Sequence, residues 1–184
     1  MDEADSATPA DVLAFWRKAG PDRWFAGDSA FDAEVRRRFF DLWRAAAAGR
    51  LTSWEASDDG KLALVIVLDQ FPRNMFRGDP RAYATDAPAR DLATRAIQGG
   101  VDLRIDPLLR EFVYLPLMHS ENLSDQERCV ELFRNAGAIE NLKYAKHHAD
   151  IIRRFGRFPH RNPILGRATT ADEQAFLESD KGVG

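Results

Sequence analysis

Hydrophobic residues recur at intervals of three and four positions along most of this chain. The clearest run lies between a capping residue, Asp28 or Ser29, and Gly49, and its members are Phe31, Val35, Phe39, Leu42, Trp43 and Ala46. This spacing places the apolar side chains on one face of an α-helix. Similar patterns, with capping residues at their ends, predict further helices at about residues 9–18, 86–98, 107–115, 124–136, 139–155 and 171–177.

The segment Leu62–Leu68 is apolar at every position. Periodicity alone fits either a buried strand or a buried helix. The only other strand-like run is Phe112–Leu115, and a sheet of two strands would be marginal. We therefore predict a central helix from about Asp59 to Phe71, apolar on all sides. Pro72 should end it, because proline disfavours helical geometry in the residue before it.

Together these segments predict an all-α fold of about eight helices packed as antiparallel pairs. The connections are short, and no Ser/Gly-rich linker or change of composition marks a boundary. We therefore expect a single domain over residues 1–184, with flexible ends at residues 1–7 and 179–184. A chain of 184 residues can bury about 70% of its unfolded surface, so it needs no metal or disulfide to fold. The sequence does not indicate an oligomeric state.

The charge distribution argues against two classes of partner. The formal net charge is −3 at pH 7, which gives no long-range attraction to nucleic acid or to an anionic membrane. The run Arg36–Arg38 spreads over about 200° of a helix, so it is a solvated face rather than a basic patch. The N-terminus is acidic, and the longest apolar run is too short to cross a bilayer. We predict a cytoplasmic protein without a nucleic-acid or membrane partner.

Cys129 is the only cysteine, which excludes an internal disulfide. It lies among apolar residues that include Val130 and Phe133. This context is typical of a small core side chain rather than of a reactive thiol.

Two neighbouring histidines lie in the helix predicted at residues 139–155. On a wheel of about 100° per residue, His148 falls within the apolar half, between Ile152 and Phe155, whereas His147 falls on the polar side. His148 is therefore expected to be buried or to line a cavity. Both a core histidine with satisfied hydrogen bonds and a pocket residue fit this position.

A polar segment follows the central apolar helix. Asp69 lies in the last predicted turn, where the negative end of the helix dipole disfavours a carboxylate. Arg73 is the nearest cation, so we predict a structural ion pair between Asp69 and Arg73. Arg73 and Asn74 are also candidate ligand-binding residues.

The segment from His119 to Glu121 offers an imidazole, a hydroxyl and a carboxylate in one short link. His119, Glu121 and His148 are candidates for handling protons in an enzyme. Their spacing matches no standard set of metal ligands, so we predict no metal site and no cofactor. Ser120 lacks the sequence context of a nucleophile elbow.

Five arginines lie between residues 153 and 167. Arg153 and Arg154 complement the dipole at the end of a helix. The remainder, residues 156–167, is punctuated by glycines and prolines, and we name it the arginine loop. Guanidinium groups on a stiff loop suit bidentate binding of carboxylate or phosphate. The ligand-binding residues predicted there are Arg157, His160, Arg161, Asn162 and Arg167. A loop clamped by internal ion pairs is an equally good interpretation.

Three segments of the chain resemble the signatures of one protein family. They are Asp69–Gly78 (DQFPRNMFRG), Leu115–Glu121 (LPLMHSE) and Arg154–Asn162 (RFGRFPHRN), the last followed by Leu165–Arg167. In these motifs, and over nearly all its length, the chain is similar to the bacterial DUF924 family. The resemblance implies a helical fold like that of tetratricopeptide repeats. The family is one of unknown function, so the resemblance implies no catalytic residue.

Two functions fit these observations. The first is a tetratricopeptide-like binding module that holds an anionic ligand or peptide at the arginine loop. The alternative is an enzyme, such as a hydrolase, in which His119, Glu121 and His148 handle protons. In that enzyme the anionic substrate would be held by Arg73, Arg157 and Arg161.

Overall fold

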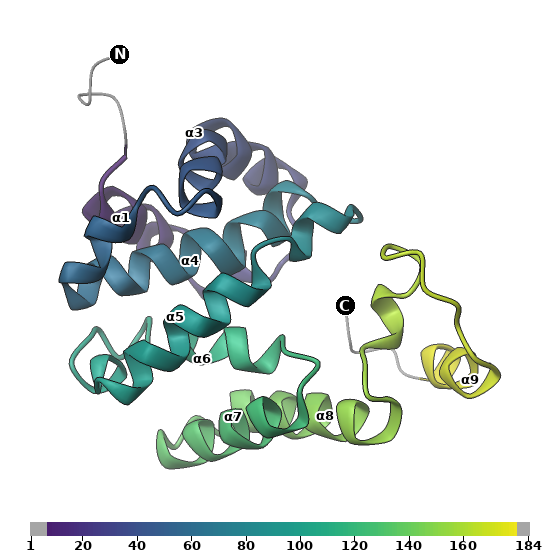
Figure 1. The fold of residues 1–184 in the computed structure, drawn as a ribbon. Coiled ribbons are helices and arrows are strands. Elements are labelled where there is room, and N and C mark those ends of the chain that lie inside the picture. The colour runs from purple at the N-terminus through teal and green to yellow at the C-terminus, as the bar shows by residue number, and fades with distance from the viewer. Residues whose placement is uncertain (1–6, 180–184) are drawn as a thin grey trace. The chain divides into compact units, whose positions relative to one another are not determined.

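The structure, a computed structural model, describes residues 7–179. These residues contain nine α-helices, joined by turns and short 3-10 helices, and no β-strand (Figure 1). The predicted all-α fold of packed helix pairs is confirmed. The additional helix is α2, a single turn too short for periodicity to reveal. The helices are α1 (Pro9–Ala19), α2 (Pro21–Trp24), α3 (Ser29–Ala47), α4 (Asp58–Met75), α5 (Asp86–Gln98), α6 (Glu111–Met118), α7 (Leu123–Asn135), α8 (Ile139–Phe155) and α9 (Ala171–Ser179).

The described residues form two compact units. Unit 1 comprises residues 7–77 and 81–116, with α1 to α5 and most of α6. Unit 2 comprises residues 78–80 and 117–179, with α7, α8 and α9. The single domain predicted over residues 1–184 stays a prediction. The ends predicted to be flexible lie, except for Ala7 and Ser179, outside the described residues.

α4 is the central helix of unit 1 and packs against α1, α3 and α5. All its residues from Leu62 to Pro72 are buried, which confirms the helical interpretation of this apolar run. Aromatic rings pack around it with centroids 4.6 to 6.4 Å apart, and they come from Phe15, Trp16, Phe31, Phe39, Phe71 and Phe112. Burial of this one helix therefore organises the core of unit 1.

The prediction that Pro72 ends the central helix is wrong, because α4 continues to Met75. Proline has no N–H, so the carbonyl of Leu68 loses its helical partner. The Thr85 hydroxyl donates to that carbonyl at 2.5 Å and itself accepts from Trp43 Nε1 at 3.1 Å. The buried carbonyl is thus satisfied from outside the helix. Pro116 likewise lies within α6.

Unit 2 is built on the pair of helices α7 and α8, which are joined by a short turn. The core of buried residues at their base consists of Ile151, Ile152 and Phe158. Leu123, Phe155 and Phe176 pack against this core, so α7, α8, the arginine loop and α9 all contribute to it. The arginine loop therefore contributes Phe158 to the core of unit 2.

The helix caps of unit 2 agree only in part with the sequence patterns. α7 begins at Leu123, one residue before the predicted start, and its N-cap is Asn122, whose side chain accepts from Ser124 N. Asn122 binds two residues ahead, as asparagine commonly does at helix starts. The capping box from Thr170 to Glu173 is present at α9, with both reciprocal hydrogen bonds.

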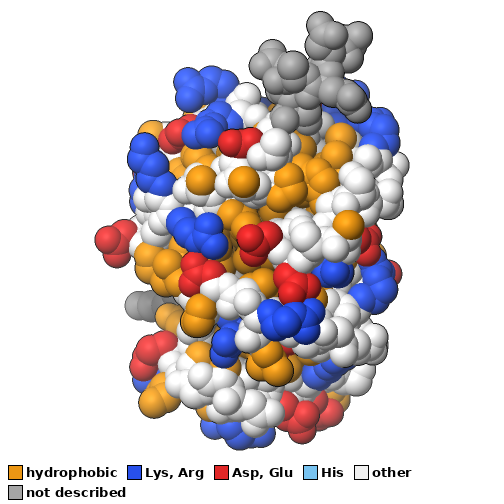
Figure 2. Space-filling view, turned by 90° about the vertical axis from the view of Figure 1, so that its left-hand side faces the viewer, with side chains coloured by type: hydrophobic (Ala, Val, Ile, Leu, Met, Phe, Trp, Pro, Cys, Tyr) orange, Lys and Arg blue, Asp and Glu red, His pale blue; other side chains and the backbone are white. Residues whose placement is uncertain are grey.

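The surface charges are mixed in sign (Figure 2), and Cys129 is buried. Figure 2 shows acidic and basic side chains interspersed over one face of the protein, with no large area of a single sign. Within the described residues, none of the helices combines the length and apolarity needed to span a membrane. Cys129 is buried, and burial raises the pKa of its thiol to about 12. The thiol therefore stays protonated and packs as an apolar side chain.

Candidate functional site

The predicted site residues fall into two groups. Asp69, Arg73 and Asn74 lie in unit 1, at the end of α4. All the others lie in unit 2, namely His119, Glu121, His148, Arg157, His160, Arg161, Asn162 and Arg167. Unit 2 therefore contains the third family-like segment and residues 117–121 of the second.

The group in unit 1 is a set of internal ion pairs. Arg73 Nη1 lies 3.2 Å from Asp69 Oδ1 and 2.7 Å from Asp86 Oδ1, and Nη2 lies 3.0 Å from Asp86 Oδ2. Burial alone would lower the pKa of Arg73, but the two carboxylates raise it above the ordinary arginine value. Asn74 Nδ2 donates to Asp32 Oδ1 at 2.8 Å. These contacts tie α4 to α5 and α3, so this group has a structural role.

Arg157 is committed to a carboxylate of α9. Its Nε and Nη2 lie 2.6 and 2.8 Å from the two carboxylate oxygens of Glu173, and Nη2 also donates to the Ala168 carbonyl at 2.8 Å. Asn162 Nδ2 donates to the same carboxylate at 3.2 Å. Mainly because of the Arg157 hydrogen bonds, the pKa of Glu173 falls to about 2. This pairing holds α9 against the arginine loop.

Arg167 forms a second ion pair of the same kind, with Glu121. We call the Arg157–Glu173 and Arg167–Glu121 pairs the two clamps. Arg167 Nη1 and Nη2 donate to the two oxygens of Glu121 at 2.8 and 3.0 Å, and its Nε donates to Asn162 Oδ1 at 2.9 Å. Glu121 also accepts from Phe158 N at 2.8 Å. Burial would raise the pKa of Glu121, but Arg167 and the Phe158 N–H hold it below the ordinary value. Glu121 is therefore an ionised anchor of the loop and a poor proton donor.

Arg161 is a buried arginine of the same loop. It is 7% exposed, and its guanidinium lies over the ring of Phe158, 4.6 Å from the centroid. Its Nη2 donates to the carbonyl of His119 at 2.9 Å. The ring of Phe158 and the carbonyl of His119 are two of the groups that orient this cation within unit 2.

His148 also lies beside Phe158, with ring centroids 5.4 Å apart. Its Nδ1 is 2.9 Å from the carbonyl of Tyr144. A carbonyl can only accept, so Nδ1 carries the proton and Nε2 presents a lone pair. Burial is the main cause that lowers the pKa of His148 to about 4, so its imidazole is neutral at pH 7. The sequence predicted that His148 is either buried with its hydrogen bonds satisfied or lines a cavity. In the structure its ring is half-buried, and one of its two nitrogens makes a hydrogen bond.

His160 is the third group around Phe158, with ring centroids 5.6 Å apart. It is half-buried and makes no hydrogen bond to any residue in the described part of the chain. Burial and then the charge of Arg161 lower its pKa to about 4. Two neutral imidazoles and one guanidinium therefore surround a single buried aromatic ring, and we name His148, His160 and Arg161 the imidazole cluster.

Nucleophilic and metal chemistry find little support here. The Ser120 hydroxyl donates to Asp125 at 2.6 Å and accepts from Asn122 N at 3.1 Å, so it stabilises the turn before α7. Residues 7–179 contain no group of three or more histidine, cysteine, aspartate or glutamate side chains arranged to hold a metal ion.

Sequence reasoning missed Glu173 as part of this region. Its position in the capping box is visible in the sequence, but the box explains only its bonds to Thr170. Glu173 is 2% exposed and binds Arg157 across 16 residues of chain. No local pattern signals a partner at that separation.

The chain matches one known family and one solved structure. A family described as bacterial protein of unknown function (DUF924) matches residues 12–181. The solved structure of a protein of unknown function from Agrobacterium tumefaciens is similar, with 47% sequence identity and a TM-score of 0.90. The similarity covers 94% of this chain and 97% of that one. No curated protein matches the chain. Because the family match covers almost the full length, the chain belongs to the DUF924 family of bacterial proteins of unknown function.

Proposed function

We propose that this chain is a cytoplasmic, tetratricopeptide-like binding module that holds an anionic ligand or peptide end at the imidazole cluster of unit 2. Arg161 supplies the positive charge, and His148 and His160 accept hydrogen bonds from the ligand. No nucleic acid or membrane is involved. The preferred ligand carries a carboxylate or phosphate together with a hydroxyl or amine donor.

One observation carries this proposal. His148 and His160 flank the same ring, Phe158, and both are neutral near pH 7. The Nδ1 bond to Tyr144 is the hydrogen bond that the described residues give His148, and they give His160 none. The remaining imidazole nitrogens can bind water or a ligand, and an anionic ligand with a hydrogen-bond donor takes the place of that water in this proposal.

The two clamps support the proposal by fixing the loop. Arg157 and Arg167 each bind a carboxylate with two nitrogens, so they hold the loop rather than the ligand. A loop fixed before binding loses little conformational entropy when the ligand arrives, which favours affinity. Of the arginines predicted to bind in the loop we retain Arg161, because its guanidinium lies over the ring of Phe158, which the two imidazoles also contact.

An enzyme is the second candidate, and the orientation of His148 favours it. The bond from Nδ1 to Tyr144 fixes the tautomer and leaves Nε2 as a proton acceptor. A pKa of about 4 makes a weak general base, because a catalytic base works best with a pKa near the working pH. Binding therefore has the better support. Hydrolysis of p-nitrophenyl phosphate or acetate that His148→Ala abolishes would favour the enzyme.

Ligand-induced stabilisation tests the binding module. Thermal unfolding is measured with inorganic phosphate, malate or O-phosphoserine, on the wild type and on His160→Ala and Arg161→Ala. A ligand at a hundred times its Kd adds about 2.7 kcal/mol, which raises Tm by roughly 5–10 °C in a chain of this length. We expect at least one of these anions to stabilise the wild type and to lose most of its effect on both variants.

Arg134→Ala is the matched control, because Arg134 is an exposed arginine of α7 in the same unit. Each variant is compared with its own ligand-free Tm, which removes any loss of stability caused by the substitution itself. A shift that persists in His160→Ala and Arg161→Ala, or a wild type that none of the three anions stabilises, contradicts the proposal.

A further inference from the structure

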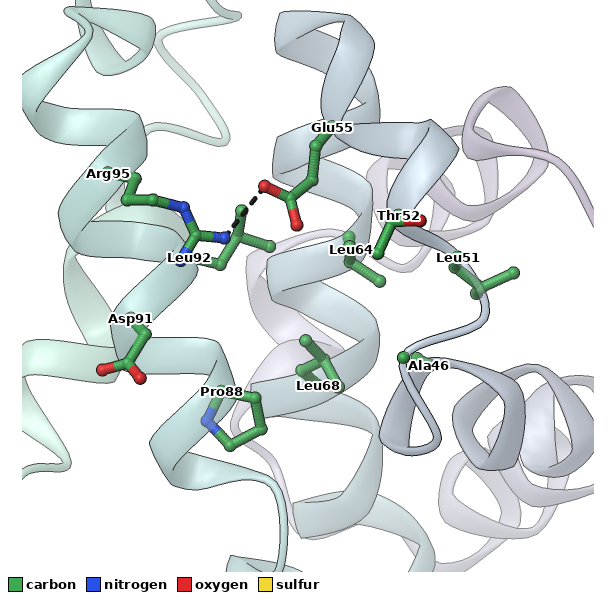
Figure 3. A pocket seen from close by; sticks show the side chains of 11 residues that line it. Ala46, Leu51, Thr52, Glu55, Leu64, Leu68, Pro88, Asp91, Leu92 and Arg95 are labelled. Carbon is green, nitrogen blue, oxygen red and sulfur yellow. Dashed lines mark hydrogen bonds and ion pairs between the residues drawn. The ribbon is translucent and has the colours of Figure 1, made fainter.

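Unit 1 contains a groove with a volume of about 200 Å³. Figure 3 shows that it is enclosed by α4 on its floor, by α5 on one side, and by the end of α3 with the following 3-10 helix (Thr52–Ala56) on the other. Leu64 and Leu68 of α4 form the floor, Leu92 of α5 lines one side, and all three are at most 5% exposed. The groove is therefore apolar below and open above.

Small residues create this space. Ala46 and Gly49 line the groove where α3 ends. A methyl group built on Gly49 would meet no atom within 4 Å, and the φ of +69° at this position disfavours any larger residue. The sequence therefore leaves this wall unfilled, and no described side chain occupies the groove.

The rim of the groove carries more negative than positive charge. Glu55 and Arg95 face each other across it and form an ion pair at 2.9 Å (Figure 3). The Asp91 side chain is 63% exposed, and among the described residues its ion pair is with its neighbour Arg90, at 3.6 Å. A cation is the complementary neighbour for this rim.

The size of the groove limits what it can take. Pockets for drug-sized molecules usually measure about 300–1,000 Å³, so about 200 Å³ is small for them. One leucine-sized side chain fits this volume. An anchoring side chain in an apolar pocket with charged neighbours is a common mode of peptide recognition.

From this size and charge we infer that the groove docks a partner peptide whose apolar side chain enters between Leu64, Leu68 and Leu92. A lysine or arginine beside that side chain faces Asp91. This surface is separate from the imidazole cluster and takes a peptide of opposite charge, so it does not depend on the proposed anion site.

Three five-residue peptides, titrated into the full ¹⁵N-labelled chain at millimolar concentration and followed by NMR, test the inference. The first has leucine between two arginines, the second has alanine in place of that leucine, and the third has leucine between two glutamates. The first peptide should shift amides at residues 51–55 and 89–95. The alanine peptide should bind at least about tenfold more weakly than the first peptide, because it lacks the buried leucine side chain.

Two variants with exposed side chains locate the binding. Thr52→Phe should fill the groove and abolish the shifts, and Asp91→Lys should weaken the arginine peptide about two- to fivefold. Asp41→Lys is the control, since Asp41 lies on α3 with a side chain 90% exposed and does not line the groove. Equal binding of the leucine and alanine peptides, tighter binding of the glutamate peptide, shifts elsewhere or no shifts would each overturn the inference.

Discussion

Glu173 and Glu121 both bind an arginine of the arginine loop, but their surroundings differ. Glu173 is 2% exposed and accepts from four donors, which are Arg157 Nε and Nη2, Asn162 Nδ2 and Thr170 N. The Glu121 side chain is 29% exposed. Glu173 is also the buried residue of α9, whose other side chains remain exposed or half-buried. The attachment of α9 therefore depends on one carboxylate more than on apolar contacts.

Acidification should test this dependence. The pKa of Glu173 is depressed from 4.5 to about 2 in the folded protein, so its contribution to stability is complete above about pH 4.5 and is lost as the pH falls toward 2. Glu173→Gln should therefore reduce the free energy of unfolding by about 2 kcal/mol at pH 7. The difference from the wild type should shrink as the pH falls from 4.5 to 2, as measured by urea unfolding.

Glu178→Gln provides the comparison, because Glu178 lies exposed on the same helix and, within residues 7–179, accepts a hydrogen bond from Gln174 alone. Hydrogen exchange of the α9 amides at pH 7 should accelerate in Glu173→Gln and stay unchanged in Glu178→Gln. If the two variants behave alike, Glu173 does not anchor α9.

The chemistry of these residues could be predicted from the sequence, but their pairing could not. Arginines on a stiff loop suggested carboxylate binding, and Arg157 and Arg167 do bind carboxylates. The carboxylates are the protein's own, and Glu121 is 46 residues away from Arg167. Ion pairs at such separations depend on how the helices pack, and sequence periodicity carries no information about that packing.

The helices themselves were predicted well where a single face is apolar, and less well at proline. A proline inside a helix leaves the carbonyl four residues earlier without its helical donor, and another donor can compensate for this loss. In this protein Thr85 supplies that donor from the N-cap position of α5, and its side chain makes no capping bond there. The continuation of α4 was therefore decided by a residue on the next helix.

A double-mutant cycle measures this compensation. Thr85→Val removes the hydroxyl that bonds Leu68 and Trp43, and it should cost about 1–3 kcal/mol because two buried polar groups lose their partner. Pro72→Ala restores an N–H within reach of the Leu68 carbonyl. In that background Thr85→Val should cost about 1 kcal/mol less, as measured by urea unfolding. Thr85→Ser keeps the hydroxyl and should retain most of the stability, whereas equal costs in both backgrounds would show that Thr85 does not compensate for Pro72.

The fold class followed from helical periodicity, and the family followed from three short motifs, because both depend on local patterns. The division into units did not, since no linker or change of composition marks it. Its boundary falls inside a helix, because residues 111–116 of α6 belong to unit 1 and Leu117 and Met118 belong to unit 2. Because α6 is continuous across the boundary, no turn or linker in the sequence marks it.

That shared helix is the reason to expect the single domain predicted from the sequence. Unfolding of either unit would leave part of α6 without its packing, so the two should unfold together. Each unit has its own probe: all four tryptophans lie in unit 1, and the sole cysteine, the buried Cys129, lies in unit 2. Tryptophan fluorescence and thiol labelling should therefore give the same urea midpoint.

Variants confined to one unit make the test decisive. In unit 1, a methyl group at Gly60 would lie 2.0 Å from the Trp54 carbonyl oxygen, so Gly60→Ala should cost about 1–3 kcal/mol. In unit 2, Glu173→Gln is the destabilising variant. If the chain unfolds as one domain, each variant lowers both the fluorescence and the thiol-labelling midpoint. If Gly60→Ala lowers only the fluorescence midpoint while Glu173→Gln lowers only the labelling midpoint, the units are separate domains that share a helix.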